Sequence, residues 1–503
     1  DYSSVAFDFS FLHKPVIYYQ FDRSRFIGKR PSHLNLDKDL PGDIVNELED
    51  LLAKLEESAN SDFIMKEEYI ERANRFIKYR DLNSSERIYE AVKEAEKEEG
   101  LVEKVVHHPV SNVLKNRFRK SKHYFPIMKK AYKVMSKVLP VDKNLILFES
   151  GLGKQFSDSP KYIYEELLKR DAPYKKVWVY NNNLPVKDKQ TKRIKRLSPE
   201  YYYYLAKAGY WVNNQNFPTY LSKRKETTYL QTWHGTPLKK MQFDIENIQG
   251  RDDEYLNRVH HATKTWDYLI SPSPYASKAF RSAFRYEKEI LEIGYPRNDL
   301  FYRDDVDELS QEIIRKLKLP TDKKVILYAP TFRDNQTSKN NKFVFELNFD
   351  LEAMKQALGD EYILLLRMHV VISNNLTIPE EYQDFVINVS KYPDIQELYL
   401  ISDILMTDYS SVMFDFANTN RPILYYTYDL DDYRDNLRGF YIDFEDEAPG
   451  PLMKTTEDII DAVLHLDEVN KKYETKYRAF RSKYCGLEDG KASERAVDLV
   501  FKD

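Results

Sequence analysis

Short apolar runs alternate with helical stretches along most of this chain, and no other feature constrains the fold as much. One series of runs extends from residues 145–148 to residues 268–270, and a second from residues 325–328 to residues 423–426. Strands that alternate with helices predict parallel sheets with helices on both faces. Two series therefore predict an α/β fold with two Rossmann-like lobes, whose ligands would bind at the carboxyl ends of the strands, in the cleft between the lobes.

The first nine residues of the chain recur near its end. Residues 1–9 return as residues 408–416 with one change, and residues 14–19 then match residues 421–426 in the same register. A match of this length indicates a repeated structural unit. We therefore expect residues 1–100 to form a partial copy of a second-lobe segment with added helices, and we expect the chain to be part of a longer protein.

The composition narrows the class of function. The 503 residues carry a net charge of −4 and a single cysteine, Cys485. This charge gives no case for a nucleic-acid partner, and one cysteine excludes an internal disulfide. The 503 residues contain no apolar run long enough to cross a bilayer. They also contain no glycine-rich phosphate loop and no zinc-type spacing, so we expect a site without a metal or another cofactor.

A basic segment separates the repeat from the two lobes. Residues 104–141 contain no Asp or Glu, and their Lys and Arg residues are interleaved with apolar and aromatic ones. Such a stretch suits an anionic membrane surface, and a solvated linker that packs on the next domain is an equal alternative. The expected domains are a partial repeat with helices (1–100), a basic amphipathic helical linker (101–141), an N-terminal lobe (142–305) and a C-terminal lobe (306–503).

A histidine follows one of the predicted strands of the first lobe. His234 lies just beyond the apolar run at residues 228–230, and Gly235 would allow the backbone to turn sharply there. A histidine at such a strand end can accept a proton near neutral pH. The alternative is a histidine that only hydrogen-bonds to a turn, and the residues alone leave both interpretations open.

Cations follow two predicted strands of the second lobe. Arg367 and His369 come after the run at residues 362–366, and a guanidinium beside an imidazole suits a diphosphate. Thr331 and Arg333 leave the strand before it and could donate to phosphate oxygens. The plainer alternatives are a salt-bridged surface pair for the first set and an ordinary strand exit for the second.

Two serines come between a third strand of this lobe and an apolar helix. Ser410 and Ser411 would lie at the N-terminus of that helix, where free N–H groups favour an anion. They could also simply cap the helix, and capping is compatible with phosphate binding. Arg297, in a turn between the lobes, is a further possible phosphate contact.

Together these motifs resemble those of the CDP-glycerol glycerophosphotransferases, the teichoic acid polymerase family, over roughly residues 142–490. The resemblance implies the GT-B arrangement of two lobes, with an acceptor side in the first lobe and a CDP-donor side in the second. It rests on five motifs in the family's order: Trp233-His234-Gly235-Thr236-Pro237-Leu238-Lys239, Gly294-Tyr295-Pro296-Arg297-Asn298-Asp299, Ala329-Pro330-Thr331-Phe332-Arg333, Arg367-Met368-His369 and Asp408-Tyr409-Ser410-Ser411.

The resemblance also implies roles for individual residues. The implied catalytic histidines are His234 and His369. The residues expected on the donor side are Arg297, Thr331, Arg333, Arg367, Asp408, Ser410 and Ser411, and those expected on the acceptor side are Gly235, Thr236 and Lys239.

From this resemblance we expect a peripheral enzyme at the cytoplasmic face of the cell membrane. It would transfer glycerol phosphate or ribitol phosphate from a CDP-activated donor to a lipid-linked acceptor and release CMP. The acceptor hydroxyl would attack the phosphorus that carries the polyol, with His234 as the base. The alternatives are a GT-B glycosyltransferase that uses a nucleotide sugar and a membrane-associated polymer-binding scaffold. The sequence leaves open glycerol or ribitol, and single addition or polymerisation.

Overall fold

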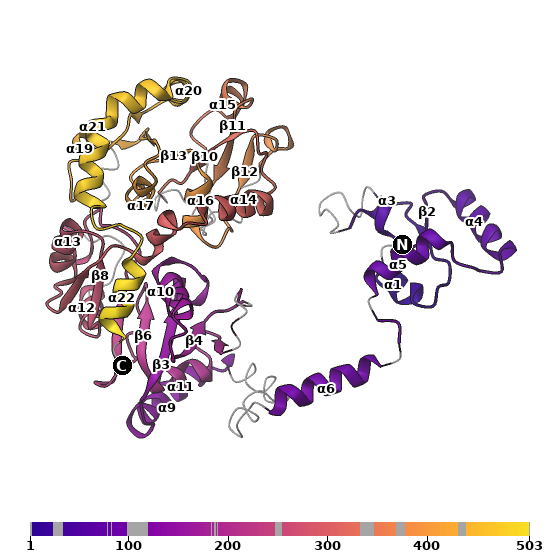
Figure 1. The fold of residues 1–503 in the computed structure, drawn as a ribbon, viewed down its shortest axis with the longest axis horizontal. Helices are drawn as coiled ribbons and strands as arrows, with labels where there is room; N and C mark the ends of the chain where they lie inside the picture. Colours follow the sequence, from indigo (N-terminus) through magenta and orange to yellow (C-terminus); the bar gives the residue numbers. More distant parts are fainter. Residues whose placement is uncertain are drawn as a thin grey trace. The chain divides into compact units, whose positions relative to one another are not determined.

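The computed structural model describes residues 3–23, 34–77, 79–81, 83–97, 119–182, 184–185, 188, 190–246, 254–331, 347–368, 378–430 and 439–501. The chain divides into two compact units, Asp1–Phe118 and Arg119–Asp503 (Figure 1). Two predicted site residues, Arg333 and His369, lie outside the described residues, as does the basic segment up to residue 118. Within the described part of the chain, none of the helices has the length and apolar character that crossing a membrane requires.

The first unit is built around a parallel pair of strands. β1 (Ile17–Tyr19) pairs with β2 (Asp43–Val45). Gly42 precedes β2 at a point where a Cβ atom would lie 2.1 Å from the carbonyl oxygen of Val16, so the close approach of the two chains requires glycine. The helices in this unit are α1 (Val5–Ser10), α3 (Leu36–Asp39), α4 (Leu48–Asn60), α5 (Glu67–Phe76) and α6 (Ser84–Lys97).

The end of the second unit repeats this arrangement. There β14 (Ile423–Tyr426) pairs in parallel with β15 (Leu452–Met453). A Cβ atom on Gly450, which precedes β15, would lie 1.9 Å from the carbonyl oxygen of Ile423. The two glycines therefore serve the same contact in the two copies, and the repeat includes the second strand of each pair.

The repeat continues to the last helix of each copy. Arg87 pairs with Asp81 at 2.8 Å at the start of α6, and Arg495 pairs with Asp489 at 2.8 Å at the start of α22 (Ala492–Val500). In both pairs the aspartate precedes the arginine by six positions. The first unit is thus a copy of the whole C-terminal part of the second lobe, not only of the segment recognised from the sequence.

The first lobe of the second unit contains a seven-stranded sheet. Its strand order is β5-β4-β3-β6-β7-β8-β9, with every neighbouring pair parallel. The strands are β3 (Asp142–Glu149), β4 (Lys175–Val179), β5 (Thr191–Ile194), β6 (Ala208–Asn213), β7 (Thr228–Gln231), β8 (Tyr268–Ser271) and β9 (Glu289–Glu292). The helices are α9 (Tyr124–Val138), η1 (Gly151–Gly153), α10 (Asp158–Lys169), α11 (Pro199–Lys207), η2 (Gln242–Asp244), α12 (Tyr255–Thr263), α13 (Pro274–Phe284) and η3 (Pro296–Tyr302).

The second lobe contains a six-stranded parallel sheet in the order β12-β11-β10-β13-β14-β15. Its remaining strands are β10 (Lys324–Tyr328), β11 (Tyr362–Leu366), β12 (Val386–Asn388) and β13 (Ile404–Thr407). Its helices are α14 (Val306–Leu317), α15 (Leu351–Leu358), η4 (Glu380–Tyr382), α16 (Ile395–Ile401), α17 (Val412–Phe416), η5 (Ala417–Thr419), α19 (Phe444–Glu447), α20 (Thr456–Leu464) and α21 (Leu466–Tyr484).

The two sheets confirm the predicted α/β fold with parallel strands. Every residue of β11 and of β13 is buried, as expected for strands that are covered on both faces. A strand of this kind needs apolar residues on both faces, because neither face reaches water, and the run Tyr362-Ile363-Leu364-Leu365-Leu366 provides them.

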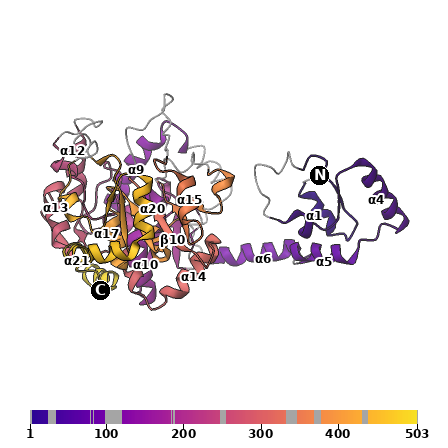
Figure 2. The same cartoon turned by 90° about the horizontal axis from the view of Figure 1, so that it is seen from above.

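The two lobes also touch through their helices. The last helix, α22, returns to the first lobe and packs beside α10 (Figure 1). Helix α21 of the second lobe packs against α13 of the first (Figure 2), with the rings of Tyr275 and Tyr484 4.7 Å apart. The chain therefore crosses between the lobes twice, and its last helix belongs by packing to the first lobe.

Helix α9 lies at the end of the predicted basic linker. Tyr124 and Tyr132 are buried where α9 packs against α11, and the Tyr132 hydroxyl donates to the carbonyl oxygen of Ser222 at 2.8 Å. Phe125 and Val134 are exposed, on different sides of the helix. One face of this helix thus packs on the adjoining lobe, and the other remains open to solvent.

Candidate active site between the lobes

Trp233 fixes the direction of the loop that carries His234. This loop leaves the carboxyl end of β7, and Trp233 adopts a left-handed backbone conformation with φ of 53°. The Trp233 ring packs 4.2 Å from the imidazole of His234 on one side and 4.6 Å from Phe284 on the other. A bulky residue in this conformation is strained, and such strain is typical of functional sites.

The hydrogen bond of His234 determines which nitrogen carries the proton. Nδ1 lies 2.8 Å from the carbonyl oxygen of Asn214, the residue after β6. A carbonyl oxygen can only accept, so Nδ1 donates, and Nε2 of the neutral ring keeps its lone pair. Part of His234 remains accessible to solvent, and desolvation by the surrounding protein lowers its pKa. The ring is therefore held neutral, as a proton acceptor requires.

Gly235 brings the first-lobe loop against the second lobe. A Cβ atom on Gly235 would lie 3.1 Å from the hydroxyl oxygen of Ser411. The chain bends at His234 and Gly235, as expected, but the residue with the left-handed backbone conformation is Trp233 and not Gly235. This contact places the residue next to His234 against a serine of the Asp-Tyr-Ser-Ser motif.

The same loop pairs with a second-lobe segment a few residues later. Lys239 forms an antiparallel bridge with Phe440, and the Lys240 N–H donates to the carbonyl oxygen of Gly439 at 2.8 Å. The ammonium group of Lys239 donates to the hydroxyl of Thr331 at 3.4 Å. Thr236, between His234 and Lys239, is buried. The loop is thus held against the second lobe by backbone and side-chain bonds together.

Three predicted donor-side residues lie at one edge of the second sheet. Thr331, Arg367 and Asp408 follow β10, β11 and β13, which are neighbours in that sheet. The Thr331 N–H donates to a carboxylate oxygen of Asp408 at 2.8 Å, and Asp408 is almost fully buried. Asp408 therefore holds the exit of β10 in place, next to the residue that contacts Lys239.

The guanidinium of Arg367 forms hydrogen bonds with backbone carbonyl groups of its own lobe. Its Nη1 donates to the carbonyl oxygens of Val389, Ser390 and Tyr392, at 2.9, 2.8 and 2.6 Å. These bonds fix the loop that follows β12. Direct contact of Arg367 with a diphosphate stays a prediction, as do the roles of Arg333 and His369, which lie outside the described residues.

The helix after the two serines is short. Ser411 is the residue before α17, its side chain makes no capping bond, and α17 has only five residues. A helix of this length has little dipole, so the predicted anion site at its N-terminus loses that part of its rationale. Ser410 and Ser411 are half-buried, and their nearness to Gly235 is the stronger reason to place them in the site.

A buried arginine joins the two halves of the site. Arg297 is 5% exposed, and its guanidinium pairs with Asp415 at 2.8 Å and with Asp158 at 3.1 Å. Burial acts to lower the pKa of Arg297, but the two carboxylates outweigh it and raise the pKa. Because both carboxylates already hold its nitrogens, we expect an indirect role for Arg297 rather than contact with a donor phosphate.

Hydrogen bonds connect this ion pair to His234. Asp158 accepts from the side-chain amide of Asn214 at 2.7 Å, and Asn214 in turn holds His234 through its carbonyl oxygen. Asp415 lies on α17, which follows Ser411. Asn214, Asp158 and Asp415 were not among the residues predicted from the sequence. The apolar run Tyr210-Trp211-Val212, which ends two residues before Asn214, was the available signal for that residue.

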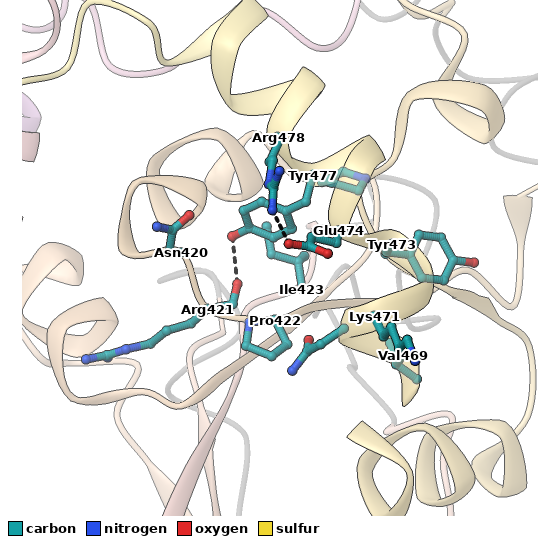
Figure 3. A pocket seen from close by; sticks show the side chains of 13 residues that line it. Asn420, Arg421, Pro422, Ile423, Val469, Lys471, Tyr473, Glu474, Tyr477 and Arg478 are labelled. Atoms are coloured by element: carbon teal, nitrogen blue, oxygen red, sulfur yellow. Dashed lines mark hydrogen bonds and ion pairs between the residues drawn. The ribbon is translucent and has the colours of Figure 1, made fainter. Parts of the chain in front are cut away.

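Two cavities lie away from these residues. One, of about 500 Å³, lies at the amino ends of β14 and β15 against α21 (Figure 3). Its cations are partly used, since Arg478 pairs with Glu474 and Nη1 of Arg421 donates to the carbonyl oxygens of Leu400 and Ser402 at 2.7 and 2.8 Å. The other, of about 720 Å³ beside α10, is lined by several carboxylates that would repel a diphosphate. Among the described residues, no cluster of three His, Cys, Asp or Glu side chains suits a metal ion.

The chain matches one protein family along most of its length. The family model described as CDP-Glycerol:Poly(glycerophosphate) glycerophosphotransferase matches residues 1–94 and 131–502. The teichoic acid poly(glycerol phosphate) polymerase of Bacillus subtilis (strain 168) is 43% identical over 75% of this chain and 51% of its own length. The teichoic acid glycerol-phosphate transferase of Staphylococcus aureus (strain NCTC 8325 / PS 47) is 43% identical over 74% of this chain and 96% of its own length.

A solved structure resembles the chain as well. The wall teichoic acid polymerase TagF is 42% identical, with a TM-score of 0.70, over 78% of this chain and 95% of that chain. A TagF variant soaked with CDPG gives the same TM-score at 41% identity. The chain spans about half the length of the Bacillus subtilis polymerase and of a second curated relative, from Staphylococcus epidermidis.

Proposed function

Because the chain belongs to the CDP-glycerol:poly(glycerophosphate) glycerophosphotransferase family, we propose that it transfers glycerol phosphate from CDP-glycerol to a lipid-linked acceptor and releases CMP. The observation that carries this proposal is the approach of Gly235 to Ser411, which sets a neutral His234 beside the strand ends of the other lobe. Transfer of a phosphoryl group between two bound substrates needs a base near the acceptor on one side of the site and groups that hold the donor on the other.

Glycerol is the polyol that the relatives favour. Two of the relatives that carry glycerol phosphate in their names are 43% identical to this chain, whereas ribitol-phosphate enzymes are 28–31% identical over similar lengths. We therefore place CDP-glycerol before CDP-ribitol as the donor. Teichoic acid is the product named for the relatives on both sides of this division.

The proposed reaction is a substitution at one phosphorus atom. The terminal hydroxyl oxygen of the acceptor attacks the phosphorus that carries glycerol, and its proton passes to Nε2 of His234. The bond from that phosphorus to the oxygen bridging the two phosphates breaks, and CMP leaves with that oxygen. Positioning and charge stabilisation supply most of the rate in such transfers.

We propose that the two lobes take the two substrates in a GT-B arrangement. Residues 142–305 form the acceptor lobe, with Gly235, Thr236 and Lys239 near the acceptor. Residues 306–503 form the donor lobe, where Thr331, Arg333, Arg367, His369, Asp408, Ser410 and Ser411 surround the diphosphate. Arg297 contributes by holding α17 and Asp158 in place.

The acceptor would reach this site from a membrane. We propose that the protein lies at the cytoplasmic face of the membrane as a peripheral protein and that the linker (101–141) contacts anionic lipid. The exposed Phe125 and Val134 of α9, next to exposed lysines, support this placement. Residues 1–100 would then form a separate domain ahead of the linker.

A donor panel tests the function directly. The purified protein receives CDP-glycerol, CDP-ribitol or a UDP-sugar with a lipid-linked acceptor that ends in a free glycerol hydroxyl, and nucleotide release is measured. We expect CMP release with CDP-glycerol and loss of that release in the His234→Ala variant. UDP release from the sugar donor would indicate the glycosyltransferase alternative, and no release from any donor would indicate a binding scaffold.

A further inference from the structure

The first unit has an apolar groove along its strand pair. The groove measures about 390 Å³ and lies between α1 and β1, where Val5, Phe9, Val16 and Ile17 line it. Phe9 is 46% exposed and Val5 65%. In the described residues β1 pairs only with β2, so its other edge carries no partner strand. A two-stranded sheet with an open apolar edge is marginally stable and invites another strand.

The second lobe shows which elements occupy the position equivalent to this groove. Phe416 and Leu424 correspond to Phe9 and Ile17, and both are fully buried. Leu424 pairs with Met406 of the parallel strand β13, and Phe416 lies in a core cluster with Leu405 of β13 and with Tyr399 of α16. The occupant of the equivalent groove is thus an apolar strand of four buried residues.

A second face of the first unit is uncovered in the same way. Leu55 on α4 is 47% exposed, whereas Val463, its counterpart on α20, is 2% exposed. Helix α20 packs against α15 in the second lobe. Both β13 and α15 come from residues 306–407, so one stretch of chain covers both faces in the complete lobe.

Polar groups in the first unit also lack partners. Gln20, at the end of β1, is 1% exposed, and neither its amide nitrogen nor its amide oxygen has a hydrogen-bond partner within the described residues. A buried amide without partners costs free energy that an incoming partner can restore.

We propose that this surface docks a half-lobe of the type that residues 306–407 form. A parallel apolar strand like Ile404–Thr407 fills the groove beside β1, and a helix like α15 covers Leu55 on α4. In the second lobe the Leu405 N–H donates to the carbonyl oxygen of Pro422 at 3.1 Å. The equivalent acceptor in the first unit is the carbonyl oxygen of Pro15, one residue before the groove.

The surface suits neither a second copy of the chain nor an anionic lipid surface. The chain's own β13 is already paired on both sides, with β10 and β14, so a second copy of the described chain has no such strand to offer. The groove is lined by apolar residues and one serine without a cation, whereas an anionic lipid surface favours Lys and Arg beside the apolar groups. A half-lobe can pack apolar side chains against the groove and pair a strand with the open edge of β1.

The test supplies that half-lobe in the full chain. A second copy of residues 306–407 is placed directly before Asp1, and amide hydrogen exchange is followed at residues 17–19. We expect exchange there to slow by about 100-fold or more, because pairing moves these amides from a fraying edge into a cooperative sheet. The control carries Asp in place of Leu405 and Met406 in the added copy and should exchange as fast as the original chain.

A cross-link provides a second measurement that does not depend on exchange rates. Ile17→Cys in the chain and Met406→Cys in the added copy should form a disulfide on oxidation, since paired strands place such residues within reach. Leu12→Cys, paired with the same added cysteine, should not. Unchanged exchange together with no cross-link would overturn the proposal. Slow exchange in the original chain that depends on protein concentration would indicate self-association instead, and slowing by anionic vesicles alone would indicate a lipid surface.

Discussion

Phe9 and Phe416 occupy the same place in two copies of one repeat, yet Phe9 is 46% exposed and Phe416 is fully buried. The local structure is alike in both copies. Each has a short helix, a strand, a close glycine contact and a parallel partner strand, and the ring of Phe7 meets Phe76 much as Phe414 meets Tyr484. The local sequence therefore builds the unit in both places, whereas burial depends on strands that are described only in the second lobe. The same dependence should hold for function, because a serine becomes part of a site only where another loop meets it.

The largest effect expected from this comparison is on catalysis. His234→Ala should lower CMP release by about 10²–10⁴-fold, the usual cost of losing a general base. His13→Ala is the matched control, since His13 is an exposed histidine of the first copy, and it should leave the rate unchanged. Steady-state CMP release by variants with unchanged circular dichroism checks both. A folded His234→Ala variant with near-normal rate would remove His234 from the mechanism.

The two copies also differ in the surroundings of a repeated aspartate. Asp415→Asn should lower the free energy of unfolding by about 3–5 kcal/mol, because it leaves the buried Arg297 with one of its two carboxylates missing. Asp8, its counterpart, is exposed, and Asp8→Asn should change stability by no more than about 0.5 kcal/mol. Urea unfolding of the second unit measures the first change. Equal effects of the two substitutions would contradict the assigned ion pair.

The phenylalanines themselves give a direct test. Phe416→Ala should cost about 3–5 kcal/mol of stability, as expected when a large side chain is removed from a core. Phe9→Ala should cost less than about 1 kcal/mol, because the ring is half exposed. Thermal unfolding monitored by fluorescence checks the pair. In the chain extended by residues 306–407, Phe9→Ala should become as costly as Phe416→Ala, and a persistently small cost would count against the docked half-lobe.

Much of the fold follows from the sequence. Runs such as Tyr362–Leu366 become strands because only a strand with both faces covered can bury five consecutive apolar residues. The full length of the repeat was not predicted, since residues 81–87 share with residues 489–495 only the aspartate and the final Ser-Glu-Arg, too short a match to stand out in the sequence. Helix α22 was placed by chain order in the second lobe, while its packing on α10 depends on long-range contacts that local pattern does not reveal.

The site was predicted in part. The positions of His234, Thr331, Arg367 and Asp408 after strand ends followed from the sequence, because parallel strands bring their carboxyl ends to one edge, and the roles of these residues stay predictions. The bond from His234 to the carbonyl of Asn214 could not be predicted, since a backbone acceptor leaves no mark in the sequence. The pairing of Arg297 with carboxylates also depends on tertiary contacts that bring distant segments together.

The pH dependence of kcat/KM tests the contacts that link His234 to Asp158, which exist only in the second unit. Desolvation lowers the pKa of His234, so the unprotonated base persists below pH 6.5, and the acid limb of kcat/KM should lie below that value. Asp158 acts in the opposite direction and raises this pKa. Asp158→Asn should therefore move the limb to still lower pH, by less than about one unit if the charge is partly screened. A limb that moves upward would contradict the assignment of His234 as the base.

The smallest expected effect concerns α9, which belongs to neither copy. Its exposed face carries Lys133 and Val134, and a lysine near an anionic bilayer contributes at most about 1 kcal/mol. Lys133→Gln should therefore lower partitioning onto vesicles that contain anionic lipid by up to about five-fold, and less as salt rises. Lys66→Gln in the first copy is the matched control, since Lys66 already pairs with Glu57 at 2.9 Å, and it should leave partitioning unchanged. Co-sedimentation with vesicles measures both. If the two variants bind alike, α9 is not the lipid contact and the basic charge that matters lies elsewhere in the linker.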